Sequence, residues 1–308
     1  MTDNERAPVA EHRLTVLSGR RAAQVLASWG LLSLLPGATI HFEGAWCTPV
    51  IRWCGDAARL AETAARSLVD STWNLAQRGL GAAGTTTPLR SVANAVSRAA
   101  WDASLKQGRL LGDDVVQSMD LSAVDRASLR NDDPRVRASD LTLLSGRSYT
   151  AKSVQDTWDL LAAKDADQAF VRAKEELARL LKGRISVVEA KPGLRFSASE
   201  PTPRTTRGSE KCDVQPLIDL LAFRAQLFLQ PRQAPVRPST SRKVLTWTVN
   251  PVPLTIEMVV DLHESPPDGL SWPRWSSVIR STEGSSKVSY LELASREDPE
   301  FSEGDRHA

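Results

Sequence analysis

The heptapeptide LTVLSGR occupies residues 14–20, and LTLLSGR repeats it with one substitution at residues 141–147. In each copy an apolar run meets a Ser-Gly pair. A helical pattern with a tryptophan follows, Trp29 after the first copy and Trp158 after the second. Both copies therefore predict a strand, a tight turn and a helix, in that order.

The turn in each copy is a candidate anion site. The first N–H groups of a helix lack partners within the helix, and the helix dipole is positive there, so an anion is favoured. Arg20, Arg21 and Arg147 add positive charge at these turns. The alternative is that Ser and Gly only form a tight turn and cap the helix, since no Gly-Lys-Thr phosphate loop follows either copy.

The composition is typical of a globular protein, with 308 residues of which 41% are hydrophobic and 25% are charged. The charges are unevenly distributed. Residues 182–243 contain twelve Lys or Arg and five Asp or Glu, whereas residues 283–308 contain three basic and seven acidic residues. The basic segment predicts a surface that faces a polyanion.

Cysteine content and hydropathy predict a cytoplasmic protein. Cys47, Cys54 and Cys212 are too few for a disulfide framework and lack histidines at zinc-ligand spacing, so reduced thiols and no metal are expected. The longest apolar stretch, residues 25–35, is too short to span a bilayer. We expect no cofactor, no small-molecule substrate and no membrane partner.

The first part of the chain, residues 1–55, reads as β-α-β-β, an order that fits a ferredoxin-like half. The expected elements are a strand at 13–17, a helix at 20–35 and strands at 39–43 and 47–53. Residues 56–182 are rich in Ala, Leu and Arg and predict a mainly helical insertion, with helices at 56–78, 90–111, 152–164 and 168–182.

Residues 183–295 predict a second α+β part. The expected elements are a hairpin of 184–190 with 194–197, a helix at 213–229, and strands at 244–249, 254–262 and 287–293. Residues 296–308 predict a disordered acidic tail. The fold class is α+β, with a mixed or antiparallel sheet built from the N- and C-terminal parts and a large helical insertion between them.

Basic side chains gather in two loops that flank the helix predicted at 213–229. Backbone phosphates are the simplest partner for such a cluster, because solubility alone does not require it. The candidate nucleic-acid contacts in this region are Arg195, Arg204, Arg207, Lys211, Arg232, Arg237, Arg242 and Lys243.

Tryptophans and histidines offer further candidates. Nine tryptophans accompany two tyrosines, and Trp53 and Trp275 each follow an arginine, which is typical of a base-stacking surface beside a phosphate contact. Trp53, Trp247, Trp272 and Trp275 are candidates for stacking or for core and interface packing. His12 or His41 as a general base predicts an alternative function, RNA cleavage, whereas the other reading is that both are structural.

Several stretches resemble subunits of the type I-U (also called type I-G) CRISPR systems, in the same order along the chain. The stretches are AAQVLASWGLLSLLPGATIHFEG, LTLLSGRSYTAKSVQDTW, GLRFSASEP, DVQPLIDLLAFRAQLFLQPRQ and KVLTWTVNPVPLT. The resemblance implies RAMP-like elements and a non-catalytic subunit of an RNA-guided antiviral surveillance complex. Its partners would be guide RNA, target DNA or both, together with neighbouring subunits. A protein-interaction module without nucleic-acid contact is the remaining alternative.

Overall fold

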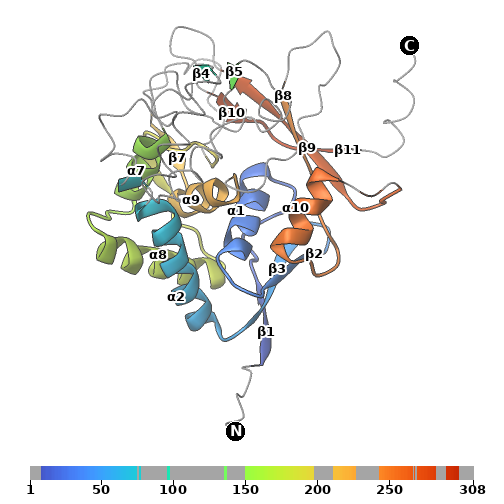
Figure 1. The fold of residues 1–308 in the computed structure, drawn as a ribbon, viewed down its shortest axis with the longest axis horizontal. Helices are drawn as coiled ribbons and strands as arrows, with labels where there is room; N and C mark the ends of the chain where they lie inside the picture. Colours follow the sequence, from blue (N-terminus) through green and yellow to red (C-terminus); the bar gives the residue numbers. More distant parts are fainter. Residues whose placement is uncertain are drawn as a thin grey trace.

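A computed structural model describes residues 8–74, 76–77, 96–97, 135–136, 150–197, 211–226, 243–265, 267, 269–281 and 289–297. The second heptapeptide, with Arg147, lies outside the described residues. The fold combines helices with antiparallel sheets, which confirms the α+β class (Figure 1).

A three-stranded antiparallel sheet forms from the N-terminal part. Its strands are β1 (Val9–Arg13), β2 (Thr39–Glu43) and β3 (Thr48–Cys54), in the order β1-β3-β2. Helix α1 (Ala22–Ser33) connects β1 to β2. The predicted β-α-β-β order is confirmed in this region except for the position of its first strand.

The strand predicted at 13–17 is wrong, because β1 ends at Arg13 and the first heptapeptide forms a turn. Leu14 and Leu17 are both buried, and the amide of Leu17 closes the turn by donating to the Leu14 carbonyl at 2.9 Å. Gly19 is required by close packing, since a Cβ there would lie 2.7 Å from Cγ1 of Val249. The heptapeptide thus fastens the start of α1 to the C-terminal part of the chain.

The described part of the region 56–182 is mainly helical, as predicted. It contains α2 (Ala57–Leu68), which continues as the π-helical turn η1 (Val69–Trp73), then α7 (Thr150–Leu160) and α8 (Ala166–Leu181). The strands β4 (Val96–Ser97) and β5 (Arg135–Val136) pair with each other. The predicted helix at 90–111 lies almost wholly outside the described residues.

Helices α1 and α9 (Pro216–Gln226) form the most extensive helix-helix contact and lie side by side at the centre of the molecule (Figure 1). Helices α2, α7 and α8 lie on one side of this pair, and the three-stranded sheet lies on the other. Nearly every residue of both helices is buried, which is consistent with their central position. At the crossing a Cβ on Gly30 would lie 1.8 Å from the Leu221 carbonyl oxygen.

A second antiparallel sheet forms from the C-terminal part. Strand β9 (Arg274–Ser281) pairs with β8 (Lys243–Thr248) on one edge, and with β10 (Ser289–Leu291) and β11 (Ser295–Glu297) on the other. The two terminal parts meet at β2, where Ile40 and Leu254 form a β-bridge and exchange hydrogen bonds of 2.8 and 2.9 Å.

Two predictions for the region after residue 183 are wrong. The strand predicted at 254–262 is helix α10 (Ile256–Glu264), which the Thr255 side chain caps by accepting from the Met258 amide. The hairpin predicted from 184–190 and 194–197 does not form, since β6 (Val188–Ala190) pairs with β7 (Cys212–Val214). The reason is that Gly193 and Leu194 pack on α7 instead, where the Leu194 amide donates to Oγ1 of Thr157 at 3.2 Å.

The disordered tail predicted at residues 296–308 is wrong for its first two residues, because Arg296 and Glu297 belong to β11 (Ser295–Glu297). Glu297 forms an ion pair with Arg274 of the neighbouring strand at 3.0 Å. The residues after 297 lie outside the described part of the chain. In that described part, no helix combines the length and the apolar character that crossing a membrane requires.

Candidate nucleic-acid interface

A cluster of one arginine and two tryptophans lies where the first heptapeptide meets both sheets. The Arg20 guanidinium carbon is 5.2 Å from the ring centroid of Trp46 and 4.8 Å from that of Trp275. Trp46 lies in the β2–β3 turn and is 70% exposed, whereas Trp275 in β9 is 7% exposed. The cluster therefore presents one open indole face beside a cation that is held in place.

Hydrogen bonds fix the turn that carries Arg20. Oγ of Ser18 donates to the Trp46 carbonyl at 2.6 Å, and the Gly19 amide donates to the Cys47 carbonyl at 2.7 Å. From the other side, Nε1 of Trp247 donates to the Gly19 carbonyl at 2.7 Å. The turn is thus tied to the β2–β3 hairpin and to β8, so the position of Arg20 is set by tertiary structure.

A second arginine, Arg296, belongs to the same cluster. It lies opposite Trp275 in the β9–β11 register and is exposed. Burial raises the pKa of the Cys47 thiol, while the charges of Arg20 and Arg296 act in the lowering direction. The register therefore places Arg296 next to Trp275, the ring that Arg20 also contacts.

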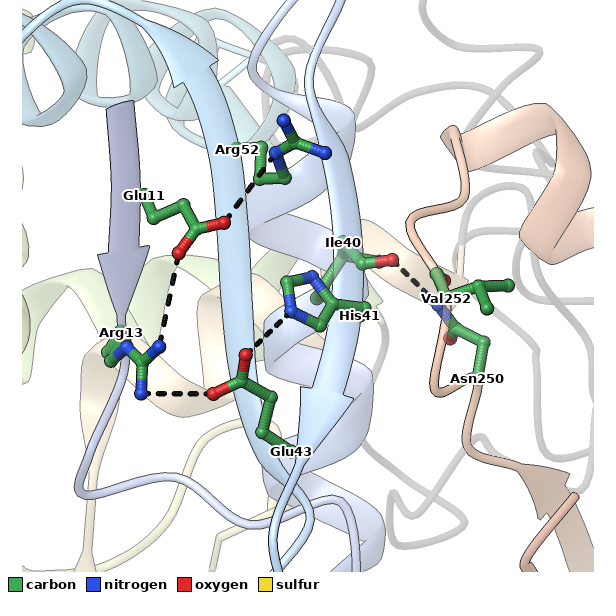
Figure 2. Close-up of polar contacts among 8 residues, drawn as sticks. All are labelled: Glu11, Arg13, Ile40, His41, Glu43, Arg52, Asn250 and Val252. Atoms are coloured by element: carbon green, nitrogen blue, oxygen red, sulfur yellow. Dashed lines mark hydrogen bonds and ion pairs between the residues drawn. The ribbon is translucent and has the colours of Figure 1, made fainter. Parts of the chain in front are cut away.

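These arginines differ from those of the three-stranded sheet in having no carboxylate partner. On that sheet, Arg13 pairs with Glu43 at 3.0 Å and Arg52 approaches Glu11 at 3.7 Å (Figure 2). Within the described ranges, Arg20, Arg21 and Arg296 form no ion pair. The start of α1 and β11 therefore carry positive charge that no carboxylate of the described residues neutralises.

The two histidines proposed as general bases occupy opposite faces of the three-stranded sheet. His12 is level with Ile40 across the sheet, and His41 is the next residue along β2, so their side chains point to different sides. Nε2 of His12 donates to the Gly55 carbonyl at 3.1 Å. These positions exclude a two-histidine site.

His41 is held by an acid. Its Nε2 donates to Glu43 at 3.0 Å (Figure 2), and this hydrogen bond is the main reason why the pKa of Glu43 is lowered. Nδ1 of His41 is buried and has no partner among the described residues. Because neither ring nitrogen is open to a substrate, the environment of His41 is that of a structural residue.

His263, the third histidine in the described part, fills a gap between α10 and β8. Its Nδ1 donates to the Val259 carbonyl at 2.7 Å, and its Nε2 accepts from the Thr248 amide at 3.1 Å. The ring packs edge-on against Trp29, with a centroid distance of 4.7 Å. Burial lowers the pKa of His263 to about 4, so the ring is neutral and its tautomer is fixed by the fold.

The other candidate residues are scattered. Trp53 and Trp247 are only 5% and 1% exposed, so in the folded protein they are core residues and cannot stack on a base. Trp272 is half-buried. Lys211 is exposed, and Lys243 begins β8. The remaining basic-loop candidates lie outside the described residues: Arg204, Arg207, Arg232, Arg237 and Arg242.

Arg195 is half-buried rather than displayed on a loop, and burial lowers the pKa of its guanidinium. The nearby carboxyl group of Asp219 is fully buried and accepts from the Ser197 amide at 2.6 Å. Burial raises the pKa of Asp219 to about 6, against the lowering effect of its hydrogen bonds with Ser197 and Arg195 and of the Arg195 charge. Arg195 therefore lies beside a buried carboxyl group and not on an open basic loop, and its role as a phosphate contact stays a prediction.

Two residues of the cluster were missed from the sequence. Trp46 follows Gly44 between two predicted strands, and an aromatic residue in a hairpin turn is a usable signal of an exposed ring. Arg296 was assigned to a disordered tail, because its segment is too short and polar to read as a strand. Arg20 and Trp275 were both candidates, but nothing in the sequence placed them together.

Metal-ligand geometry among the described residues and similarity to known proteins give no further assignment of this site. Among the described residues, no three His, Cys, Asp or Glu side chains are grouped as a metal ion would require. Comparison with known protein families, curated proteins and solved structures found no match to this chain.

Proposed function

We propose that this protein binds a single nucleic-acid strand without cutting it, as a subunit of a cytoplasmic type I CRISPR surveillance complex that contacts guide RNA or target DNA. The observation that carries the binding proposal is the position of the Arg20 guanidinium between Trp46 and Trp275. Membership of the complex is supported by the resemblance described above.

The cluster has the chemistry that a single strand needs. An exposed indole face stacks on any base, and such stacking contributes about 1–3 kcal/mol per base. Arg20 lies over the Trp46 ring, and Arg296 lies opposite Trp275 in the β9–β11 register. Both are free of carboxylate partners within the described residues, so they suit the phosphates of a strand. These contacts read the strand's backbone and base faces, while sequence would be read by pairing with the guide.

Trp46→Ala is expected to weaken binding of a fluorescently labelled single-stranded RNA by about 5- to 150-fold, which corresponds to one lost stacking contact. Trp46→Phe keeps an aromatic face and should retain most of the affinity. Val187→Ala changes another exposed apolar side chain and should have no effect. Fluorescence anisotropy measures all four proteins, with labelled DNA of the same sequence as a second ligand. Equal affinities for the wild type and Trp46→Ala would remove the stacking role.

A further inference from the structure

Beside the arginine-tryptophan cluster lies a cavity of about 210 Å³. Its walls come from the start of α1, from residues 196–197 and 215, and from residues 291–294, which comprise the end of β10 and the link to β11. Pockets for drug-sized ligands measure about 300–1,000 Å³. This cavity is smaller, so its size suits a single base or a comparably small group.

Two segments of the chain connect residues that line the cavity with residues of the cluster. Arg21 lines the cavity, and its neighbour Arg20 lies between the two tryptophans. Ala294 lines the cavity, and Arg296 of the cluster is two residues further on. Arg20 and Arg21 are consecutive residues, so the group that contacts the tryptophans and the group that lines the cavity leave neighbouring points of the backbone.

The lining combines apolar walls with uncommitted polar groups. Phe196 and Leu291 supply the apolar surface. Gln215 uses its backbone amide and carbonyl to bond Ser197 at 2.8 and 3.3 Å, while its side-chain amide has no partner among the described residues. The Arg21 side chain is exposed and likewise without a partner there. A carboxamide and a guanidinium are thus available to a ligand.

The N-terminus of α1 lacks a cap where it borders the cavity. No side chain accepts from its first-turn amides, and no acidic residue lies in that turn. The helices α2 and α8 are capped by the side chains of Asp56 and Asp165. The amides of Ala22 and Ala23 therefore retain their preference for an anion beside Arg21.

We propose that the cavity binds one unpaired nucleotide of the strand, with its phosphate against Arg21 and the start of α1 and its base against Gln215. This inference rests on the proposed function. Glu292 contributes the carboxylate of the cavity lining and repels a phosphate, so the phosphate is favoured at Arg21. A glutamine amide bonds adenine through two hydrogen bonds, so adenine fits best.

Saturation-transfer NMR with adenosine 5′-monophosphate, adenosine and ribose 5-phosphate tests the cavity in the full-length protein. The monophosphate should bind about tenfold more tightly than either fragment, with the strongest transfer to its base protons. Arg21→Gln should reduce its affinity about tenfold and leave adenosine unchanged. Gln215→Leu should weaken the monophosphate and adenosine about fivefold and leave ribose 5-phosphate unchanged. Arg66→Gln removes an exposed arginine of α2 and should change nothing.

Two results overturn the inference while leaving strand binding intact: RNA binds but the monophosphate does not, or the monophosphate binds equally to Arg21→Gln, Gln215→Leu and the wild type. If single-stranded RNA itself does not bind, the proposed function fails, and the cavity loses the strand that would deliver its nucleotide. The anisotropy measurement on RNA and the NMR measurement on the monophosphate therefore separate the two failures.

Discussion

Gly30→Ala is expected to lower the free energy of unfolding by about 3 kcal/mol or to prevent folding. The added methyl carbon would lie 1.8 Å from the carbonyl oxygen of Leu221 and 2.7 Å from its carbonyl carbon, which belong to the backbone of α9. A backbone segment in the middle of a buried helix cannot turn aside as a side chain can. The two central helices would have to separate, and the core on both sides of them would lose its packing.

The direction of the expected change in stability distinguishes Gly30→Ala from an ordinary Gly-to-Ala substitution in a helix. In an unobstructed helix, replacing Gly with Ala raises stability by about 1 kcal/mol, because alanine is the better helix former. Thr63→Ala on the half-exposed side of α2 makes a comparable change in propensity and should be neutral or slightly stabilising. Chemical denaturation measures both variants. A Gly30→Ala protein as stable as the wild type would contradict the close crossing of α1 and α9.

His263 is expected to make folding pH-dependent. Its pKa falls from 6.5 in the unfolded chain to about 4 in the folded protein, because burial disfavours the charged ring. Between these values the unfolded state binds a proton that the folded state excludes. The stability that His263 contributes is therefore present above pH 6.5 and is lost as the pH falls toward 4, by about 3 kcal/mol in all.

The difference in unfolding free energy between the wild type and His263→Gln isolates this effect, since other groups titrate in both proteins. That difference should shrink by about 3 kcal/mol between pH 7 and pH 4. A constant difference would contradict the buried, neutral state of the ring.

Asp219 provides a control, because the stability that it contributes changes with pH in the opposite direction. Burial raises its pKa from 3.8 to about 6, so its contribution is present below pH 3.8 and is lost as the pH rises through 6. The wild type should therefore lose stability relative to Asp219→Asn over the same range in which it gains stability relative to His263→Gln.

The parts of the fold that were predictable are those with local signals. Thr39–Glu43 was predicted with its observed bounds, because a run of β-branched and aromatic residues lies between Pro36-Gly37 and Gly44. The strand prediction for the α10 segment is wrong because Ile256, Val259 and Val260 are residue types that are typical of strands. Its buried residues, Val259, Leu262 and His263, nevertheless follow the spacing of a helix, and Thr255 before them is a good cap.

The candidate interface was only partly predictable, for a physical reason. Arg20 was marked by its place after a Ser-Gly turn and Trp275 by its neighbouring arginine, both local features. The contact between Arg20 and Trp275 joins a loop and a strand that are more than two hundred residues apart. Such a contact depends on the packing of the two sheets around α1, which no local pattern records. The same limit applies to the Gly30–Leu221 crossing, since an isolated glycine in a helix does not identify its partner.

The most direct test of the proposed function is the salt dependence of binding to single-stranded RNA. Phosphate contacts release counterions, so the logarithm of affinity should fall linearly with the logarithm of salt concentration, by about 0.7 for each phosphate contact. Arg20→Gln should bind more weakly and reduce the slope by about 0.7, whereas Arg66→Gln should leave the slope unchanged. A flat response in the wild type, or the same slope in Arg20→Gln, would contradict the assignment of this cluster to a nucleic-acid strand.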